Sequence, residues 1–336
     1  MRAAGPAHVY DRSMARVFSG MKPTGDATLG SLLGALRPWV AAQNAEAYYC
    51  VVDLHALTVP HDPVGLRRQT LELATLFLAV GIDPEVGTLF VQSHVHEHAE
   101  LAWLMECTAA FGELNRMTQF KDKSAQRDFV SAGLFTYPAL MAADILLYNT
   151  EEVPVGDDQR QHVELTRDVA ERFNSRYGQT FTVPKAVVGR VGARVMDLQD
   201  PTRKMSKSDD SAAGTILILE DLASVAKKIK RAVTDTNYDP KQPGAANLLS
   251  ILSACTGADP DVLAARYTQY GPLKGDVTEA VTAVLEPVQK RYRELEADPA
   301  TLAKILERGA EKAQTVAAAT LDRARRNIGL LVRGEG

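Results

Sequence analysis

Residues 200–210, which read DPTRKMSKSDD, bring three cations and two serines together within eleven positions. Arg203, Lys204 and Lys207 follow a proline and stand among small hydroxyl side chains. Lysine ammonium groups in a polar loop can bind phosphates as point charges, and they can stabilise the charge that builds on a leaving pyrophosphate. A solvated cluster of surface charges is the alternative, and it is the commoner outcome for such runs.

A second stretch, FSGMKPTGDATLGSLLGA over residues 18–35, places glycines where a strand is expected to turn into a helix. It matches neither GxGxxG nor GxxxxGK[ST], so the standard dinucleotide and P-loop signals are missing from it. Gly30 at the start of the helix would let a flat base pack against bare backbone, and Thr28 would cap the helix or donate to a phosphate. An ordinary turn with an N-cap is an equally good interpretation.

A third candidate is Asp144, a carboxylate inside the apolar segment LMAADILLY at residues 140–148. A buried carboxylate needs a hydrogen-bond donor, and we expect a ligand N–H to be that donor unless Asp144 lies on the helix surface. The nearby His94, His96 and His98 lack the HExxH spacing, and no second cluster completes a metal site. We expect a polar loop there and no bound metal.

Composition and charge limit the classes of protein to which this chain can belong. Its 336 residues are 46% hydrophobic and 24% charged, which predicts a globular chain of about two domains. The net charge of −4 means that a nucleic acid would need a local basic surface. We expect that no segment spans a membrane. We also expect that the cysteines are free thiols, that residues 1–15 form a flexible leader and that the protein is cytoplasmic.

Strand and helix patterns alternate along the first two thirds of the chain. Apolar runs predict strands over residues 15–20, 47–53, 87–93 and 150–156, and helical patterns cover 30–43, 62–81 and 158–178. Pro38 is expected to bend the first of these helices. This alternation predicts an α/β fold with a doubly wound parallel sheet, and from about Glu220 onward the pattern is all helical.

In their order and spacing, these segments resemble the class I aminoacyl-tRNA synthetases. KMSKS (residues 204–208) lies well downstream of TLGS (28–31), which stands where that class has its HIGH signature. The closer similarity is to the bacterial tryptophanyl-tRNA synthetases, from about Arg16 to the C-terminus. It is carried by VFSGMKPTGDATLGSLLGAL, VVDLHALTV, GELNRMTQFKDKS, TYPALMAADILLYNTEEVPVGDDQRQHVELTRD, KMSKS and AVTDT.

The resemblance implies an enzyme that activates L-tryptophan with ATP and Mg²⁺ to tryptophanyl-adenylate, then transfers it to the 3′ end of tRNA(Trp). It implies a Rossmann-like catalytic domain over residues 16–200, a KMSKS loop over 201–215 and an anticodon-binding helical region over 216–336. A homodimer is also implied, with the tRNA spanning both subunits.

The resemblance also assigns residues to sites. Tryptophan would be bound by Phe18, His55, Tyr137, Met141, Asp144, Ile145, Val153, Val155 and Gln159. Asp144 would accept the indole N–H, and Tyr137 and Gln159 would surround the α-amino group. ATP would be bound by Lys22, Thr28, Gly30, Ser31, Gln119, Asp158, Val195 and Met205. Catalytic roles would fall to Lys123, Lys204, Lys207, Thr28 and Ser206.

Two positions depart from the family pattern, and three other functions compete with this interpretation. Lys22 stands where the family often has glutamine, and Ser31 replaces the last residue of the HIGH signature, so the contact with phosphate is weaker there. The alternatives are a tyrosyl-tRNA synthetase, a small nucleotidylyltransferase and a synthetase-like regulatory protein that binds tryptophan.

Overall fold

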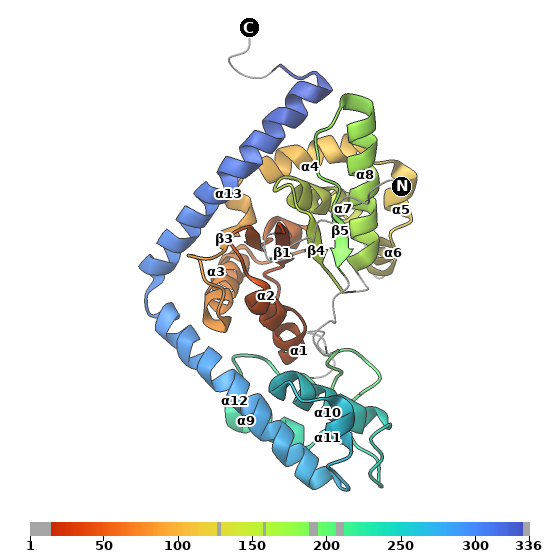
Figure 1. Cartoon of the computed structure of the whole chain (residues 1–336), viewed down its shortest axis with the longest axis vertical. Coiled ribbons are helices and arrows are strands. Elements are labelled where there is room, and N and C mark those ends of the chain that lie inside the picture. Colours follow the sequence, from red (N-terminus) through yellow and green to blue (C-terminus); the bar gives the residue numbers. More distant parts are fainter. Residues whose placement is uncertain (1–14, 126–128, 157–158, 188–193, 206–211, 332–336) are drawn as a thin grey trace, which may run out of the picture.

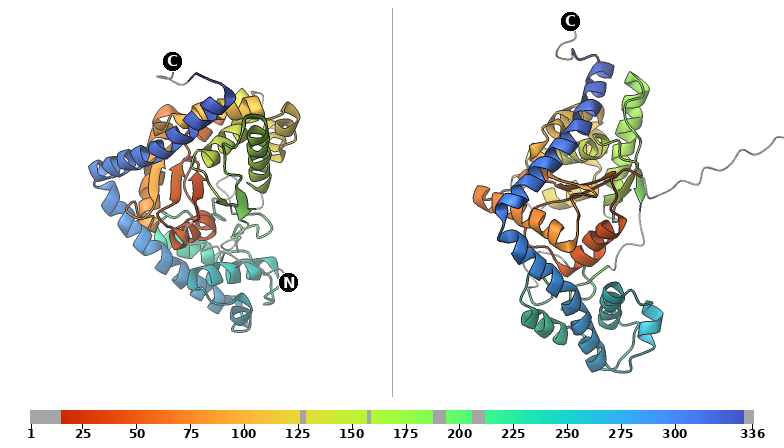
Figure 2. Two further views of the ribbon diagram at one scale, coloured as in Figure 1. Left: turned by 45° about the horizontal axis from the view of Figure 1, so that its top comes forward. Right: turned by 60° about the vertical axis from the view of Figure 1, so that its left-hand side comes forward.

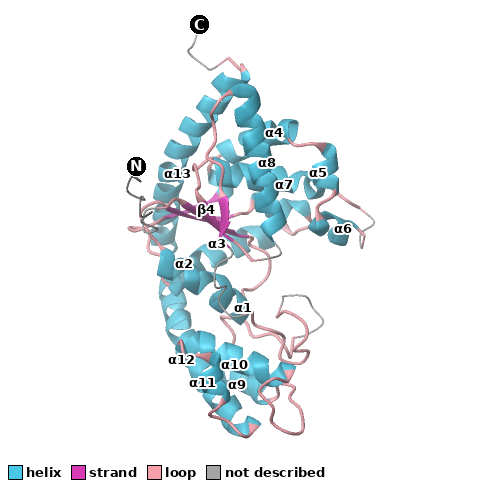
Figure 3. Ribbon diagram, turned by 45° about the vertical axis from the view of Figure 1, so that its right-hand side comes forward, coloured by secondary structure: helices cyan, strands magenta, loops and turns pink. Residues whose placement is uncertain are grey.

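The computed structural model describes residues 15–125, 129–156, 159–187, 194–205 and 212–331 (Figure 1). Its centre is a five-stranded parallel sheet with the strand order β3-β2-β1-β4-β5. The strands are β1 (Val17–Met21), β2 (Ala47–Val51), β3 (Thr88–Val91), β4 (Glu152–Pro154) and β5 (Lys185–Val187). Helices cover both faces of the sheet, which confirms the predicted α/β fold with a doubly wound parallel sheet (Figure 3).

The strand order reverses between β1 and β4, and this reversal opens the sheet. β2 and β3 lie to one side of β1, whereas β4 and β5 lie to the other. β1 pairs with β2 along its whole length but with β4 only at Val17 and Glu152. The two strands therefore diverge toward their carboxyl ends, and ligands bind at such switch points in open α/β sheets.

The helices of the first part of the chain begin and end largely where the pattern predicts. They are α1 (Leu29–Ser31), η2 (Leu32–Leu36), α2 (Arg37–Ala42), η3 (Leu54–Thr58), α3 (Pro63–Val80), η4 (Gln92–His94), α4 (Glu97–Thr108), α5 (Phe111–Asn115), α6 (Thr118–Ser124), α7 (Ala132–Leu146) and α8 (Arg160–Tyr177). The expected disturbance near Pro38 takes the form of a π-helical turn, η2, directly before the helix in which the proline lies. A proline lacks the N–H that a regular ladder needs.

The second part of the chain is helical, as the sequence predicts. It comprises α9 (Leu222–Lys230), α10 (Pro243–Thr256), α11 (Pro260–Ala264), α12 (Tyr270–Glu296) and α13 (Pro299–Ile328). α12 and α13 are the two longest helices in the described ranges, and they run one after the other along a single side of the molecule (Figure 2). α13 returns to the sheet and packs against β3.

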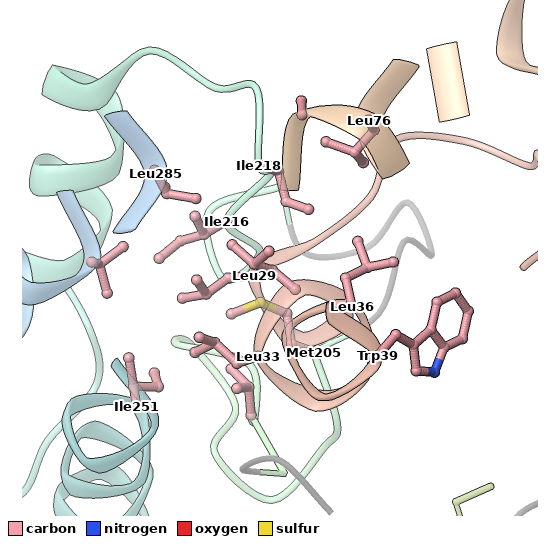
Figure 4. Close-up of a cluster of buried hydrophobic side chains, with 14 of the residues drawn as sticks. Leu29, Leu33, Leu36, Trp39, Leu76, Met205, Ile216, Ile218, Ile251 and Leu285 are labelled. Atoms are coloured by element: carbon pink, nitrogen blue, oxygen red, sulfur yellow. The ribbon is translucent and has the colours of Figure 1, made fainter. Parts of the chain in front are cut away.

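Two hydrophobic cores lie on the two faces of the sheet. Tyr48 and Cys50 of β2 point into a core that also contains residues of α4, α7, α8 and α13. Tyr49 and Val51 point to the other face, and that core continues without a break into the helical part. Figure 4 shows the junction: Leu29 lies beside Ile216, with side chains from α10 and α12 nearby. This second core therefore joins the sheet to the helical part of the chain.

Candidate active site

A cavity of about 340 Å³ opens where β1 and β4 diverge. Its walls come from β1, the end of β4, η3 and one face of α7. All nine residues that the resemblance assigns to tryptophan line this cavity: Phe18, His55, Tyr137, Met141, Asp144, Ile145, Val153, Val155 and Gln159. Lys22 and Gln119, which it assigns to ATP, line the same cavity.

Helix α7 supplies four of these side chains because of their spacing. Tyr137, Met141, Asp144 and Ile145 follow one another at intervals that place them on one face of a helix. The Ser131 side chain accepts the backbone N–H of Leu134 and so fixes the start of the helix. This helical face is the wall of the cavity opposite the sheet.

Asp144 lies at the base of the cavity with only 1% of its surface exposed. Its Oδ1 accepts hydrogen bonds from Gln92 Nε2 and from His98 Nδ1, both at 2.6 Å. Its Oδ2 lies 2.7 Å from His55 Nε2. The prediction that Asp144 is buried and needs a partner is confirmed, but the protein itself already provides three partners.

This surrounding keeps Asp144 ionised. Burial alone would raise the pKa of its carboxyl, but the charge and hydrogen bond of His55 and the hydrogen bond of His98 outweigh burial and lower the pKa to about 2. A carboxylate accepts about four hydrogen bonds, so one position on Oδ2 is left for a further donor. The site can therefore receive an N–H group from a ligand in the cavity.

Aromatic rings contribute to the lining and to the layer behind it. Phe18 stacks on Tyr148 with ring centroids 5.6 Å apart and an interplanar angle of 7°. On the opposite wall the Tyr137 hydroxyl lies 2.6 Å from His162 Nε2, and burial raises the Tyr137 pKa to about 12. The phenol is therefore neutral at physiological pH. A flat apolar ligand with one N–H group matches this combination of rings and a carboxylate.

A second cluster of predicted residues gathers at the start of α1. A Cβ at Gly30 would lie 3.5 Å from Thr28 Oγ1, 3.6 Å from Val195 Cβ and 3.8 Å from the Met205 carbonyl oxygen. Thr28 caps α1 by accepting the N–H of Ser31. The structure thus brings together Thr28, Gly30, Ser31, Val195 and Met205, although more than 160 residues separate Thr28 from Val195 in the sequence. Within the described ranges they do not contribute to the lining of the first cavity.

The backbone beside Lys204 is anchored to the helical part. Lys204 is exposed and forms an antiparallel bridge with Met196. The Asn247 side chain of α10 accepts the Met196 N–H at 2.8 Å and donates to the Met196 carbonyl at 2.9 Å. The predicted Ser206, Lys207 and Asp158 lie outside the described residues, as does the Lys123 side chain.

Sequence reasoning missed four residues of the site: Ser19, Gln92, His98 and Tyr148. The predicted environment of His98 was wrong: the sequence indicated a polar loop, but His98 is fully buried in α4. A signal was available: His98 shares its helical face with Leu101, Ala102 and Met105, which are all buried. The Ser19 hydroxyl lines the cavity and has no hydrogen-bond partner in the described part of the chain.

Two further properties concern metals and membranes. Within the described ranges, His, Cys, Asp and Glu side chains nowhere gather in threes that could hold a metal ion. Among the described helices, none combines the length and the apolar character that crossing a membrane requires.

The chain matches the family model of tRNA synthetases class I (W and Y) over residues 11–286. It is 54% identical over 330 residues to tryptophan–tRNA ligase 1 of Streptomyces coelicolor, covering 95% of this chain and 98% of that protein. The crystal structure of tryptophanyl-tRNA synthetase from Mycoplasma pneumoniae is similar at a TM-score of 0.87 and 35% identity, covering 95% and 98% of the two chains. The enzyme from Campylobacter jejuni, complexed with ADP and tryptophan, is similar at a TM-score of 0.81 and 36% identity, covering 94% and 100%. The chain belongs to the class I tRNA synthetases of the tryptophan and tyrosine group.

Proposed function

We propose that the cavity beneath β1 and β4 binds L-tryptophan, and that the cluster at the start of α1 binds ATP. The chain is an enzyme, a tryptophan–tRNA ligase, as its relatives are. One observation carries the assignment of the cavity. Asp144 is an ionised carboxylate with one acceptor position left, in a cavity that Phe18, Met141, Ile145, Val153 and Val155 line with apolar surface.

The indole ring would occupy the apolar part of the cavity. Its faces would contact Phe18, Met141 and Ile145, and its N–H would donate to Oδ2 of Asp144. Tyrosine is smaller than tryptophan, so it would underfill the cavity, and its phenol O–H is not placed where the indole N–H lies. Tyr137 and Gln159, which also line the cavity, would hold the α-amino group.

ATP would lie between the two clusters. The adenosine would pack on the backbone of Gly30, with Thr28, Val195, Met205 and Asp158 around it. The phosphates would be met by Lys22, Ser31, Gln119, Lys123, Lys204, Ser206 and Lys207. The described residues offer Mg²⁺ no cage of three side-chain ligands, so the ion would enter with the triphosphate.

The chemistry would then follow from positioning and charge. The tryptophan carboxylate attacks the α-phosphorus in line, the bond to the β-phosphate oxygen breaks, and pyrophosphate leaves with the electron pair. Lys204 and Lys207 would stabilise the charge on that leaving group. A ribose hydroxyl at the 3′ end of tRNA(Trp) then attacks the carbonyl carbon, and AMP leaves.

The helical part is proposed to bind the anticodon, and the contacts of two arginines on α13 indicate which helices would contact the tRNA. Arg325 of α13 pairs with Glu100 and Asp322, and Arg323 donates to the Thr180 carbonyl and to Asn149. These two arginines therefore hold α13 to the catalytic part. We assign the tRNA contact to the helices α9 to α12. We also propose that the enzyme is cytoplasmic.

A homodimer is also part of the proposal. Phe111 is 73% exposed, and its ring lies 5.1 Å from that of Phe135, which lies 5.1 Å from that of Phe120. A second copy of the chain would cover this aromatic surface. Sedimentation of Phe111→Asp against the wild type tests this, because a monomer is expected only for the variant.

ATP–pyrophosphate exchange with tryptophan and with tyrosine tests the proposed function. We expect exchange with tryptophan, and a fall of about 10- to 100-fold in kcat/KM for Asp144→Asn, since a hydrogen bond to a charged group is lost. Asp168→Asn, which changes an exposed carboxylate on α8, is the matched control and should leave exchange unchanged. Exchange driven by tyrosine and not by tryptophan would overturn the assignment.

A further inference from the structure

We infer that His98, which lies behind the cavity and does not line it, is a positioning residue that sets how strictly the enzyme requires an N–H group on its amino acid. The inference rests on the proposed role of Asp144 as the acceptor of the indole N–H. His98 is fully buried in α4, and the described cavity lining does not include it. It acts through the carboxylate of Asp144.

The hydrogen bonds divide the two oxygens of Asp144 between two tasks. Oδ1 accepts from Gln92 and His98, both at 2.6 Å, and these two donors fill its acceptor positions. Oδ2 accepts from His55, a residue of the cavity wall, and has one position left. The two donors behind the cavity therefore hold the carboxylate so that its remaining acceptor position belongs to the oxygen nearer the ligand.

Asp144 and Tyr148 hold the His98 ring from its two nitrogens. The Asp144 carboxylate is ionised and can only accept, so Nδ1 of His98 carries a proton and donates it to Oδ1. The Tyr148 hydroxyl lies 2.7 Å from Nε2 of His98, and burial holds the Tyr148 pKa well above its usual range, so the hydroxyl keeps its proton. The hydrogen bond between this hydroxyl and Nε2 fixes the rotation of the ring and with it the direction of the Nδ1–H group.

An aromatic cage keeps Tyr148 in place. Its ring stacks on Tyr48 at 4.4 Å and on Phe18 at 5.6 Å, and Phe90 meets it edge-on at 5.6 Å. Phe18 is itself part of the cavity wall. The same rigid stack thus fixes the floor of the cavity and the hydroxyl that orients His98, so the carboxylate is pre-oriented before a ligand arrives.

The test compares L-tryptophan with β-(3-benzothienyl)-L-alanine, which has the same shape but sulfur in place of the indole N–H. The readout is the ratio of kcat/KM values for the two amino acids in ATP–pyrophosphate exchange by the full chain. A site built around a hydrogen bond rejects the analogue that lacks it, so we expect the wild type to favour tryptophan by at least tenfold. A wild-type ratio near one would overturn the proposed role of Asp144 itself.

Two substitutions of His98 then test the inference. His98→Asn keeps an N–H donor at the position of Nδ1 and should preserve the wild-type ratio within about threefold. His98→Leu removes the donor and should lower the ratio by about tenfold, the equivalent of one hydrogen bond to a charged group. His94→Leu, at an exposed histidine of the same segment, is the matched control and should leave the ratio unchanged.

The outcomes separate positioning from packing. An unchanged ratio in a folded His98→Leu variant would overturn the inference, and so would equal losses in the Asn and Leu variants, because loss of packing alone would then explain both. If His98→Leu does not fold, Tyr148→Phe decides the question, since it removes only the hydroxyl from the aromatic stack. A fall in the ratio of about threefold or more supports the inference, and an unchanged ratio overturns it.

Discussion

Gly309 on α13 lies so close to the edge of the sheet that a single methyl group should disturb both the fold and the proposed tryptophan site. A Cβ built at Gly309 would lie 1.7 Å from the Leu89 carbonyl oxygen and 2.8 Å from its carbonyl carbon. Real Cβ contacts stay beyond 3.0 Å, so the helix and β3 would have to separate by at least 1.3 Å, the difference between 3.0 and 1.7 Å. The neighbour is backbone, which cannot swing aside.

The size of the effect follows from two opposing contributions. Overpacking of this kind costs up to about 3 kcal/mol, and alanine in place of glycine in a helix returns about 1 kcal/mol. Gly309→Ala should therefore lower the free energy of unfolding by about 2 kcal/mol. Gly275→Ala on α12 is the matched control: apart from its own helix, no atom of the described residues lies within 4 Å of its Cβ, so the free energy of unfolding should rise by up to about 1 kcal/mol.

The catalytic consequence follows from the position of β3. The strand ends at Val91, and the next residue is Gln92, whose amide donates to Asp144. A displaced strand should loosen that carboxylate, so the KM for tryptophan should rise severalfold while kcat changes less. Urea unfolding and pyrophosphate exchange measure the two effects. If Gly309→Ala were as stable as Gly275→Ala, the close packing of α13 against β3 would be refuted.

Other predictions concern the groups around the two clusters. Asn247→Ala should slow adenylate formation without changing tryptophan affinity, because it frees the backbone at Met196; stopped-flow tryptophan fluorescence would measure both. Lys207→Ala should slow adenylate formation more strongly and leave tryptophan affinity nearly unchanged, and loss of tryptophan binding would contradict the proposed contact of Lys207 with the leaving pyrophosphate. Ser19→Ala should raise the thermal midpoint without ligand, since it removes a buried unpaired hydroxyl worth about 1–3 kcal/mol. Asp144 has a folded pKa of about 2, below its unfolded value, so its stabilisation is full above pH 5 and about 2 kcal/mol is lost toward pH 2. Urea titrations of Asp144→Asn should lack that loss.

Local chemistry explains which parts of the fold could be predicted. The runs that became β2 and β3 are apolar throughout because both faces of those strands are buried, and Asp62, Pro63 and Gly81 mark the ends of α3. β5 was missed although β4, which is equally short, was predicted. None of the three residues of β5 is buried, so no run of buried apolar residues marks this edge strand in the sequence.

The site shows a similar limit. Its residues along α7 could be grouped from their helical spacing, but the partners of Asp144 come from η3, η4 and α4. Between 46 and 89 residues separate them from Asp144 in sequence. Which of three nearby histidines turns inward depends on how α4 packs against α7, and that packing is a property of the folded chain.

The anchoring of the Lys204 segment explains how the two halves of the enzyme can act together. Met205 packs in the core that joins the sheet to the helices, and its N–H donates to the Val195 carbonyl at 3.0 Å. Asn247 holds the next residue, Met196, to α10 by two hydrogen bonds. Any shift of α10 is therefore passed to the backbone that carries Lys204, while Asp144 stays fixed by its own partners behind the cavity. Substitutions at Asn247 should therefore change the rate of adenylate formation, whereas substitutions at His98 should change the selectivity for the amino acid. Because the two sites act independently, the free-energy effects of the two substitutions should add in a double variant.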